Sequence, residues 1–404
     1  MAWPVPQGSS PHKPRIAVCH PRLSWGGSEK KVLWTIEALK HTYDLTLITS
    51  GSLNYDDVNR YYGTALHPGD FRIVQVPLPF FLKKATIAAA WQGALYKRFC
   101  RRLARDFEVM ISGYGPCDFG MPGIHYIADF SWSPAIRKAL HPSPPNWYHK
   151  FGLWKNIYSW AIKKIEGASG LAFPSAEDLF ISVSPWASRK LREACGLPSQ
   201  VMYTPAVGCY PHIPWSKKEP GFVCLGRIAP EKRIEQIIKI VSLLREKGYP
   251  LHLHIIGGFE NRAYGRFIQR LSGKNPDWVF LEGRLFEKDK IQMLASHRYG
   301  LHACYGDAFP GAVVEMIMAG CIPFVSREGG QADVVGHPGL IFDDTPDAVR
   351  KIIAFLNDEP APRRVQNHLK KQVGQYSVDI FLSEIRRTVK QFLEKSRPRR
   401  TLTI

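Results

Sequence analysis

The sequence lacks the closely spaced cysteines of a disulfide framework or a cysteine-based zinc site. Its 404 residues contain eight cysteines, and no two of them form a Cys-x-x-Cys pair. Scattered cysteines of this kind are typical of free thiols in a reducing compartment. The pattern argues against the class of small secreted domains that depend on disulfides.

Long apolar runs are also missing. No stretch reaches the roughly 18 consecutive apolar residues that a membrane-spanning helix requires. The opening residues, MAWPVPQGSSPHKP, contain no apolar core of signal-peptide length. We therefore expect a cytoplasmic protein that is neither exported nor inserted across a membrane.

Acidic residues are few compared with basic ones. There are 35 Asp and Glu against 54 Lys and Arg, which gives a formal net charge of +19. Such an excess implies attraction to an anionic partner, for which nucleic acid, acidic lipid and a phosphorylated substrate all qualify. Apolar residues make up 45% of the chain, close to the globular average, so most of it is expected to fold.

Short strand-like segments alternate with amphipathic segments of helix length. This alternation predicts parallel sheets covered by helices, and 404 residues exceed one ordinary core. One series opens at PRIAVCHP and a second at GFVCLGRI, so we predict two doubly wound Rossmann-like domains facing a central cleft. The predicted segments are a flexible tail over 1–13, an N-terminal domain over 14–208, a linker over 209–220, a C-terminal domain over 221–375, a helix over 376–396 and a basic tail over 397–404.

Ligands of such sheets bind at the carboxyl ends of the strands, and two cations lie at one of these ends. Arg227 ends the strand GFVCLGRI, and Lys232 is predicted in the first turn of the following helix. Positive side chains oppose the helix macrodipole there unless an anion is bound, so the pair suits a diphosphate. The alternative is that both are ordinary surface charges.

Two carboxylates lie at another strand end, in YGDAFPGAVVEMIMAG. Asp307 follows a strand, and Pro310 is expected in the first turn of the next helix, where the amides of Gly311 and Ala312 lack intrahelical partners. Glu315 is placed to bind a ribose diol and Asp307 the hydroxyls of an attached sugar, so that one carboxylate would contact each end of a nucleotide sugar. The alternative is that Asp307 caps the helix and Glu315 is solvated.

Taken together, GRIAPEKR, the Asp-x7-Glu stretch ending in EMIMAGCIPFVSREGG, and the early GGSEK resemble glycosyltransferase family 4. The resemblance covers nearly the whole chain and is strongest from about Gly221 to Val335. It implies the GT-B fold, with the C-terminal helix crossing back to the N-terminal domain. It also implies a retaining hexosyltransferase that moves a sugar from a UDP- or GDP-sugar to a hydroxyl of a glycan acceptor, with the acceptor on the N-terminal domain and the donor on the C-terminal one.

The resemblance also assigns roles to individual residues. It implies that Arg227 and Lys232 bind the diphosphate, that Glu315 binds the ribose, and that Asp307 binds the sugar. The implied catalytic residues are His125, Arg227, Lys232 and Asp307. The alternative for His125, a single histidine between apolar neighbours, is a core residue whose polar atoms are satisfied. The implied donor-binding residues are Gly26, Gly27, Arg227, Lys232, Gly283, Arg284, Asp307, Phe309, Pro310, Gly311, Ala312 and Glu315. Two departures are that the family usually has Glu where this chain has Asp307, and that TPAVG replaces the usual Asn-Gly before the linker.

The expected mechanism lowers the barrier by stabilising negative charge on the departing phosphate. No isolated Asp-x-Asp stands at a strand end, so we expect no metal and no other cofactor. Because no carboxylate stands out as a covalent nucleophile, we expect same-face attack by the acceptor hydroxyl, as the resemblance suggests.

Two basic segments that also carry aromatic residues, 80–107 and 146–166, predict docking on an anionic membrane surface and a lipid-linked acceptor on its cytoplasmic face. The first contains Lys83, Lys84, Lys97, Arg98, Arg101, Arg102 and Arg105, and the second contains Trp147, Trp154 and Trp160. The alternative is that both pack on a sheet and leave a solvated basic face.

Two other functions stay open, a nucleotide-sugar epimerase or hydrolase on the same fold and a nucleic-acid-binding protein, although no nucleic-acid-binding motif supports the second.

Overall fold

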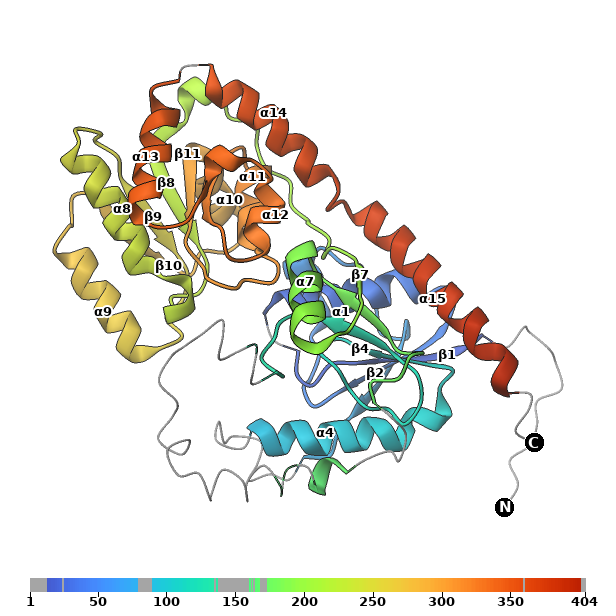
Figure 1. The fold of residues 1–404 in the computed structure, drawn as a ribbon. Helices are drawn as coiled ribbons and strands as arrows, with labels where there is room; N and C mark the ends of the chain where they lie inside the picture. The colour runs from blue at the N-terminus through green and yellow to red at the C-terminus, as the bar shows by residue number, and fades with distance from the viewer. Residues whose placement is uncertain are drawn as a thin grey trace. The chain divides into compact units, whose positions relative to one another are not determined.

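The computed structural model describes residues 13–23, 25–78, 89–133, 136, 160, 162, 164–167, 173–358 and 360–400 (Figure 1). These residues form two compact units. Unit 1 takes the described residues up to Tyr126, those from 160 to Leu179, and those from Leu382 onward. Unit 2 takes the described residues from Ile127 to 136 and from Phe180 to Phe381.

The first sheet has the strand order β3-β2-β1-β4-β5-β6-β7, and its β6 and β7 group with unit 2. Its elements are β1 (Arg15–Cys19), α1 (Gly27–Leu39), β2 (Asp44–Thr49), α2 (Tyr55–Tyr62), β3 (Arg72–Gln75), α4 (Ala89–Leu103), the 3-10 turn η2 (Ala104–Asp106), β4 (Val109–Ser112), β5 (Ile124–Ile127), β6 (Leu179–Ser182), α7 (Pro185–Cys195) and β7 (Gln200–Val201). Pairing is parallel from β3 through β2, β1 and β4 to β5. Because β4 and β5 are buried along their whole length, they are continuous apolar runs apart from Ser112 and His125.

The second sheet lies wholly in unit 2, with the order β10-β9-β8-β11-β12-β13. Its elements are η4 (Trp215–Lys217), β8 (Glu219–Leu225), η5 (Pro230–Lys232), α8 (Ile234–Glu246), β9 (Leu253–Ile256), α9 (Arg262–Gly273), β10 (Val279–Gly283), α10 (Glu287–Ser296), β11 (His297–His302), α11 (Gly311–Met318), β12 (Ile322–Ser326), α12 (Gly330–Val335), η6 (Pro338–Leu340), β13 (Ile341–Phe342), α13 (Thr345–Leu356) and α14 (Ala361–Gly374). The pairs β10–β9, β9–β8, β8–β11, β11–β12 and β12–β13 are all parallel.

Helices cover both faces of the second sheet. In Figure 1, α8, α9 and α13 lie on one face and α10, α11 and α12 on the other. The apolar residues of α8 recur on one side of the helix, at Ile234, Ile237, Ile238, Val241 and Leu244, and all five are buried in the core of this unit. Helices thus shield both faces of the sheet from solvent, as is usual for a parallel sheet.

The last helix, α15 (Val378–Arg400), leaves unit 2 and returns to unit 1. Arg386 Nε donates a hydrogen bond to the carbonyl of Ala38 in α1, at 2.8 Å. This confirms the prediction that the C-terminal helix crosses back to the N-terminal domain. The helix extends to Arg400 and so includes the first residues of the segment that was predicted to be a basic tail.

Among the described residues, no helix combines the length and the apolar character that a bilayer crossing demands.

Candidate donor site

The predicted donor residues of unit 2 come mainly from two loops at one end of the second sheet. One loop follows β8 and carries Arg227 and Lys232, and the other follows β11 and carries Asp307. Strand β8 lies between β9 and β11 in the sheet. The chain adds β9 and β10 on one side of β8 and then returns to add β11, β12 and β13 on the other side. Such a topological switch point is where doubly wound sheets bind ligands.

Lys232 and Asp307 form an ion pair at this point. Lys232 Nζ lies 2.7 Å from Asp307 Oδ2, and each side chain is only 17% exposed. His302 Nε2 lies 3.5 Å from the same carboxylate oxygen. Burial alone would lower the pKa of Lys232 and raise the pKa of Asp307, but the attraction between them outweighs it, so the pKa of Lys232 is raised and that of Asp307 is lowered. Both groups are therefore ionised at neutral pH.

The backbone around Lys232 differs from the prediction. Lys232 ends the 3-10 turn η5 instead of starting α8, and Arg233 then adopts a left-handed conformation with φ of 49°. The helix begins only at Ile234, whose amide donates to the hydroxyl of Tyr264 at 2.8 Å. The expected placement of Lys232 in the first helical turn was wrong, because the left-handed Arg233 separates the 3-10 turn from the helix.

Arg227 lies on the surface of the same loop. Its guanidinium is 58% exposed and pairs with Glu231 at 3.2 Å and with Glu260. The strand end beneath it is crowded, because a Cβ at Gly257 would lie 1.8 Å from the carbonyl oxygen of Gly226. An anion that binds Arg227 would have to compete with two carboxylates that the sequence did not point to.

Glu315 also has an unforeseen partner. Lys290 Nζ, from α10, lies 2.6 Å from Glu315 Oε2, and both side chains are about one-quarter exposed. Burial raises the pKa of the Tyr210 hydroxyl, and the charge of Glu315 raises it further. The carboxylate thus has a fixed orientation, set by a lysine of the preceding helix.

The start of α11 corrects one detail, because Pro310 is the N-cap of this helix and not a residue of its first turn. The amide of Gly311, expected to lack an intrahelical partner, donates to the carbonyl of Phe309, which lies outside the helix, at 3.0 Å. Ala312 is the second residue of the helix. The ring of Phe309 packs near Tyr376, with ring centres 5.6 Å apart, so its half-buried side chain lies against the core of unit 2.

The loop after β12 donates a hydrogen bond to the backbone of Asp307. The sequence pointed to this loop only through the family resemblance. The amide of Gly330 donates to the carbonyl of Asp307 at 2.7 Å, and the amide of Gly306 donates to the carbonyl of Glu328 at 2.8 Å. Gly329 has φ of 146°, and a Cβ at Gly330 would lie 2.5 Å from the carbonyl oxygen of Ala308. Two consecutive glycines after a strand were the available signal for this close contact.

Gly283 is the last residue of β10, the edge strand of this sheet, and Arg284 follows it. Gly283 has φ of 68°, which favours glycine, and its carbonyl accepts from the amide of Gly257 at 2.7 Å. Arg284 lies over Gly258, where an added Cβ would be 3.3 Å from the guanidinium. The absence of a side chain at Gly258 therefore leaves room for this arginine.

The remaining predicted residues lie in unit 1. Gly26 is the N-cap of α1; its amide donates to the hydroxyl of Tyr62 at 2.9 Å, and an added Cβ would lie 2.6 Å from Glu29 Oε2. Gly27 is the first residue of α1, and a Cβ there would have open space within 4 Å. A side chain at Gly26 would have to displace the carboxylate of Glu29, and the phosphate contacts of Gly26 and Gly27 stay a prediction.

His125 is fully buried in β5. Its Nε2 lies 3.1 Å from Asp178 Oδ1, and its ring stacks on Phe119. Burial would raise the pKa of Asp178, but hydrogen bonds from His125 and from the amides of Ser175 and Gly123 lower it. This arrangement fixes the imidazole firmly, and the catalytic role of His125 stays a prediction.

Part of the first basic segment lies outside the described residues, including Lys83 and Lys84. In α4, the side chains of Ala94, Tyr96 and Cys100 are buried in the core of unit 1. Two of the cations make internal ion pairs: Lys97 with Glu166 at 3.0 Å and Arg101 with Asp118 at 3.1 Å.

Arg102 and Arg105 remain exposed. In the second segment Trp147 and Trp154 are not described, and Trp160 is 61% exposed, with Lys164 Nζ 4.9 Å from the centre of its ring.

His302, Cys304 and Asp307 offer ligand atoms within 4.8 Å of one another. Burial raises the pKa of Cys304 to about 12, so its thiol is protonated and a poor ligand. The ammonium of Lys232 already supplies a positive charge against Asp307, which disfavours a second cation at the same oxygen.

Residues 211–372 match the family of glycosyl transferases group 1. This segment belongs to that family. It contains all the predicted donor residues of unit 2, from Arg227 to Glu315, and the motifs that suggested the resemblance lie in it except for GGSEK.

Similar proteins support the same family and fold. A mouse GDP-Man:Man(3)GlcNAc(2)-PP-Dol alpha-1,2-mannosyltransferase is 25% identical over 81% of this chain and 75% of its own length. The uncharacterized glycosyltransferase YqgM of Bacillus subtilis is 26% identical over 40% of this chain, and the match spans only 46% of that relative. The structure of Anabaena Alr3699/HepE in complex with UDP and glucose superposes with a TM-score of 0.65 at 13% identity, covering 94% of this chain and all of that one.

The predicted resemblance is thus confirmed for glycosyl transferases group 1 and for the GT-B fold. The narrower placement in family 4 stays a prediction.

Proposed function

We propose that the protein is a retaining hexosyltransferase that moves a sugar from a UDP- or GDP-sugar to a hydroxyl of a glycan acceptor. The observation that carries this proposal is the buried Lys232–Asp307 pair, next to the exposed Arg227, at the switch point of a group 1 segment. A lysine whose pKa is raised and an arginine supply permanent positive charge where a diphosphate leaving group would develop negative charge. The chemistry needs no metal ion or other cofactor.

Each carboxylate has a role in this proposal. Asp307, held ionised by Lys232, accepts hydrogen bonds from sugar hydroxyls, and Glu315, oriented by Lys290, accepts them from the ribose. The acceptor hydroxyl attacks the same face of the anomeric carbon that the diphosphate leaves. His125 of unit 1 is assigned near the reacting carbon by resemblance, and Gly26 and Gly27 near the phosphates.

A thermal-shift panel of UDP-, GDP- and ADP-sugars tests the donor. A ligand that binds only the folded protein at a hundredfold excess over its Kd stabilises it by about 2.7 kcal/mol. We expect a rise in Tm of about 5–10 °C with one class of nucleotide sugar. Glu315→Gln should reduce this rise, and Glu246→Gln, on the same unit, should not. No rise with any nucleotide sugar at millimolar concentration would contradict the proposal.

A lipid-linked acceptor and peripheral attachment to the cytoplasmic face of a membrane form the second part of the proposal. Support comes from the exposed Arg102 and Arg105 and from the mouse relative, whose name includes a PP-Dol acceptor. We expect the protein to float with vesicles that contain anionic lipid and not with neutral vesicles. Arg102→Ala with Arg105→Ala should weaken flotation, whereas Arg270→Ala with Lys274→Ala, exposed in unit 2, should not. Equal, negligible flotation with both kinds of vesicle would exclude membrane binding.

A further inference from the structure

Three histidines gather at the other end of the second sheet, where β8, β9 and β11 begin. They are His252 and His254, at the start of β9, and His297, the first residue of β11. One ring nitrogen of each lies within 4.8 Å of the others. The predicted donor residues of unit 2 follow the carboxyl ends of the strands. The histidines and the donor residues therefore lie at opposite ends of the strands of one sheet.

We propose that His252, His254, His297 and Glu219 form a binding site for a divalent transition-metal ion such as zinc. Two histidines face each other, with His252 Nε2 and His297 Nε2 3.2 Å apart. Glu219 Oε2 lies 3.6 Å from the first of these nitrogens and 3.7 Å from the second. Ligand atoms of a tetrahedral zinc ion bound at about 2.0–2.1 Å lie roughly 3.3 Å apart, so this triangle has nearly the size of one face of the tetrahedron.

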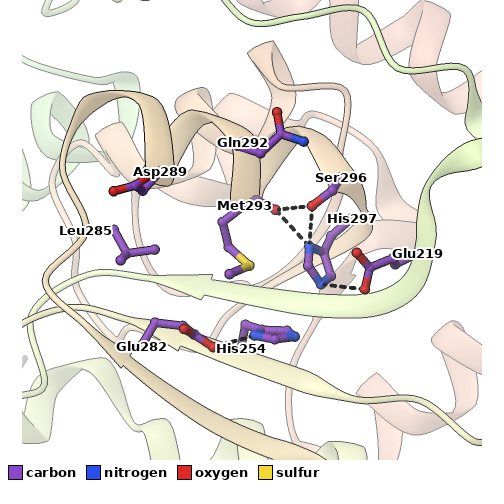
Figure 2. A pocket seen from close by; sticks show the side chains of 9 residues that line it. All are labelled: Glu219, His254, Glu282, Leu285, Asp289, Gln292, Met293, Ser296 and His297. Carbon is purple, nitrogen blue, oxygen red and sulfur yellow. Dashed lines mark hydrogen bonds and ion pairs between the residues drawn. The ribbon is translucent and has the colours of Figure 1, made fainter.

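Two of the histidines have the outer partners that metal ligands need. His297 Nδ1 lies 2.7 Å from the carbonyl of Met293, to which it donates, and this leaves the Nε2 lone pair directed at the proposed ion. His254 Nδ1 lies 2.6 Å from Glu282 Oε1. Figure 2 shows both arrangements, with His297 between Met293 and Glu219. A carbonyl or carboxylate on the far nitrogen is the usual support of a metal-bound imidazole.

The third histidine, His252, packs directly against a glycine. A Cβ at Gly221, in β8, would lie 2.1 Å from His252 Nε2, so this ring occupies the space that any side chain at 221 would fill. The ion would join the starts of three adjacent strands, with Glu219 as the ligand at the start of β8.

Zinc titration of the full-length protein tests the site. Protein stripped with a chelator is titrated against a chromophoric zinc indicator, in a Cys195→Ser, Cys209→Ser background that removes the exposed thiols. We expect one tightly bound equivalent, with affinity reduced at least a hundredfold by His252→Ala or His254→Ala. Glu282→Gln, which changes only an outer partner, should weaken binding about 10–100-fold. The control is His337→Ala with His368→Ala, another adjacent histidine pair of unit 2, which should leave affinity unchanged.

Two further measurements separate metal binding from a simple hydrogen bond between the histidines. Zinc should raise the Tm of the wild type and not that of His252→Ala, and bound Co2+ should show visible d–d absorption without thiolate charge transfer. Absence of a bound equivalent in the folded wild type, or equal affinity in His252→Ala, would overturn the proposal. Thiolate charge transfer would do the same, because it would place the ion on cysteine.

Discussion

Arg227→Ala and Lys232→Ala should each lower the release of nucleoside diphosphate from the donor about 10²–10³-fold, the usual loss for one group that stabilises developing charge. The two variants should differ in stability. Arg227 is 58% exposed, so its loss should change the free energy of unfolding by no more than about 1 kcal/mol. Removing Lys232 leaves the buried carboxylate of Asp307 without its main partner, which costs about 3–5 kcal/mol.

This difference separates a chemical role from a structural one. Arg227→Ala should fold normally and still turn over slowly, which an effect on folding alone would not explain. Lys239→Ala, an exposed cation on the adjacent α8, is the matched control and should keep both turnover and stability. The donor is the nucleotide sugar that the thermal-shift panel selects. Near-normal diphosphate release in both Arg227→Ala and Lys232→Ala would rule out the assigned roles.

The sequence was sufficient to place the candidate residues at strand ends but not to pair their side chains. Arg227 and Asp307 were expected at one edge of a sheet, because the carboxyl ends of parallel strands share an edge. Lys232 lies in a 3-10 turn that the left-handed Arg233 separates from α8, and such a conformation is rare outside glycine and has no sequence signal in a basic residue. The Lys290–Glu315 pair depends on how α10 packs beside α11, which periodicity does not specify.

The same limit explains why the histidine cluster was overlooked. In LHLHIIGG, His252 and His254 are two residues apart, so their side chains point to the same face of a strand. His297 joins them only because β8, β9 and β11 are neighbours, an order that the alternation of strands and helices leaves open. His125 shows the reverse case, since its strand was predicted but its partner Asp178 comes from a distant loop.

The second large expected effect concerns Lys218, a buried lysine near the end of the predicted linker. Lys218 was expected within a stiff hinge over 209–220, yet its residue is only 4% exposed. Its Nζ donates to the carbonyls of Ala295 at 2.5 Å, of Ala319 at 2.9 Å and of His297 at 3.4 Å. Burial lowers the pKa of Lys218, but three acceptor carbonyls favour the ammonium form, which has three hydrogens to give. Ala295 and Ala319 lie at the C-terminal ends of α10 and α11, where carbonyls have no intrahelical donor and attract positive charge.

Lys218→Met should therefore lower the free energy of unfolding by about 2–4 kcal/mol, since it keeps the apolar stem and leaves these buried carbonyls without a donor. The measurement is urea unfolding, in which the midpoint should fall while the slope stays the same. Lys217→Met is the matched control, because Lys217 is exposed and the change should have no measurable effect. If both variants unfolded at the wild-type urea concentration, Lys218 would contribute nothing measurable, and β8 would be held by its pairing with β9 and β11 and by packing of its apolar residues.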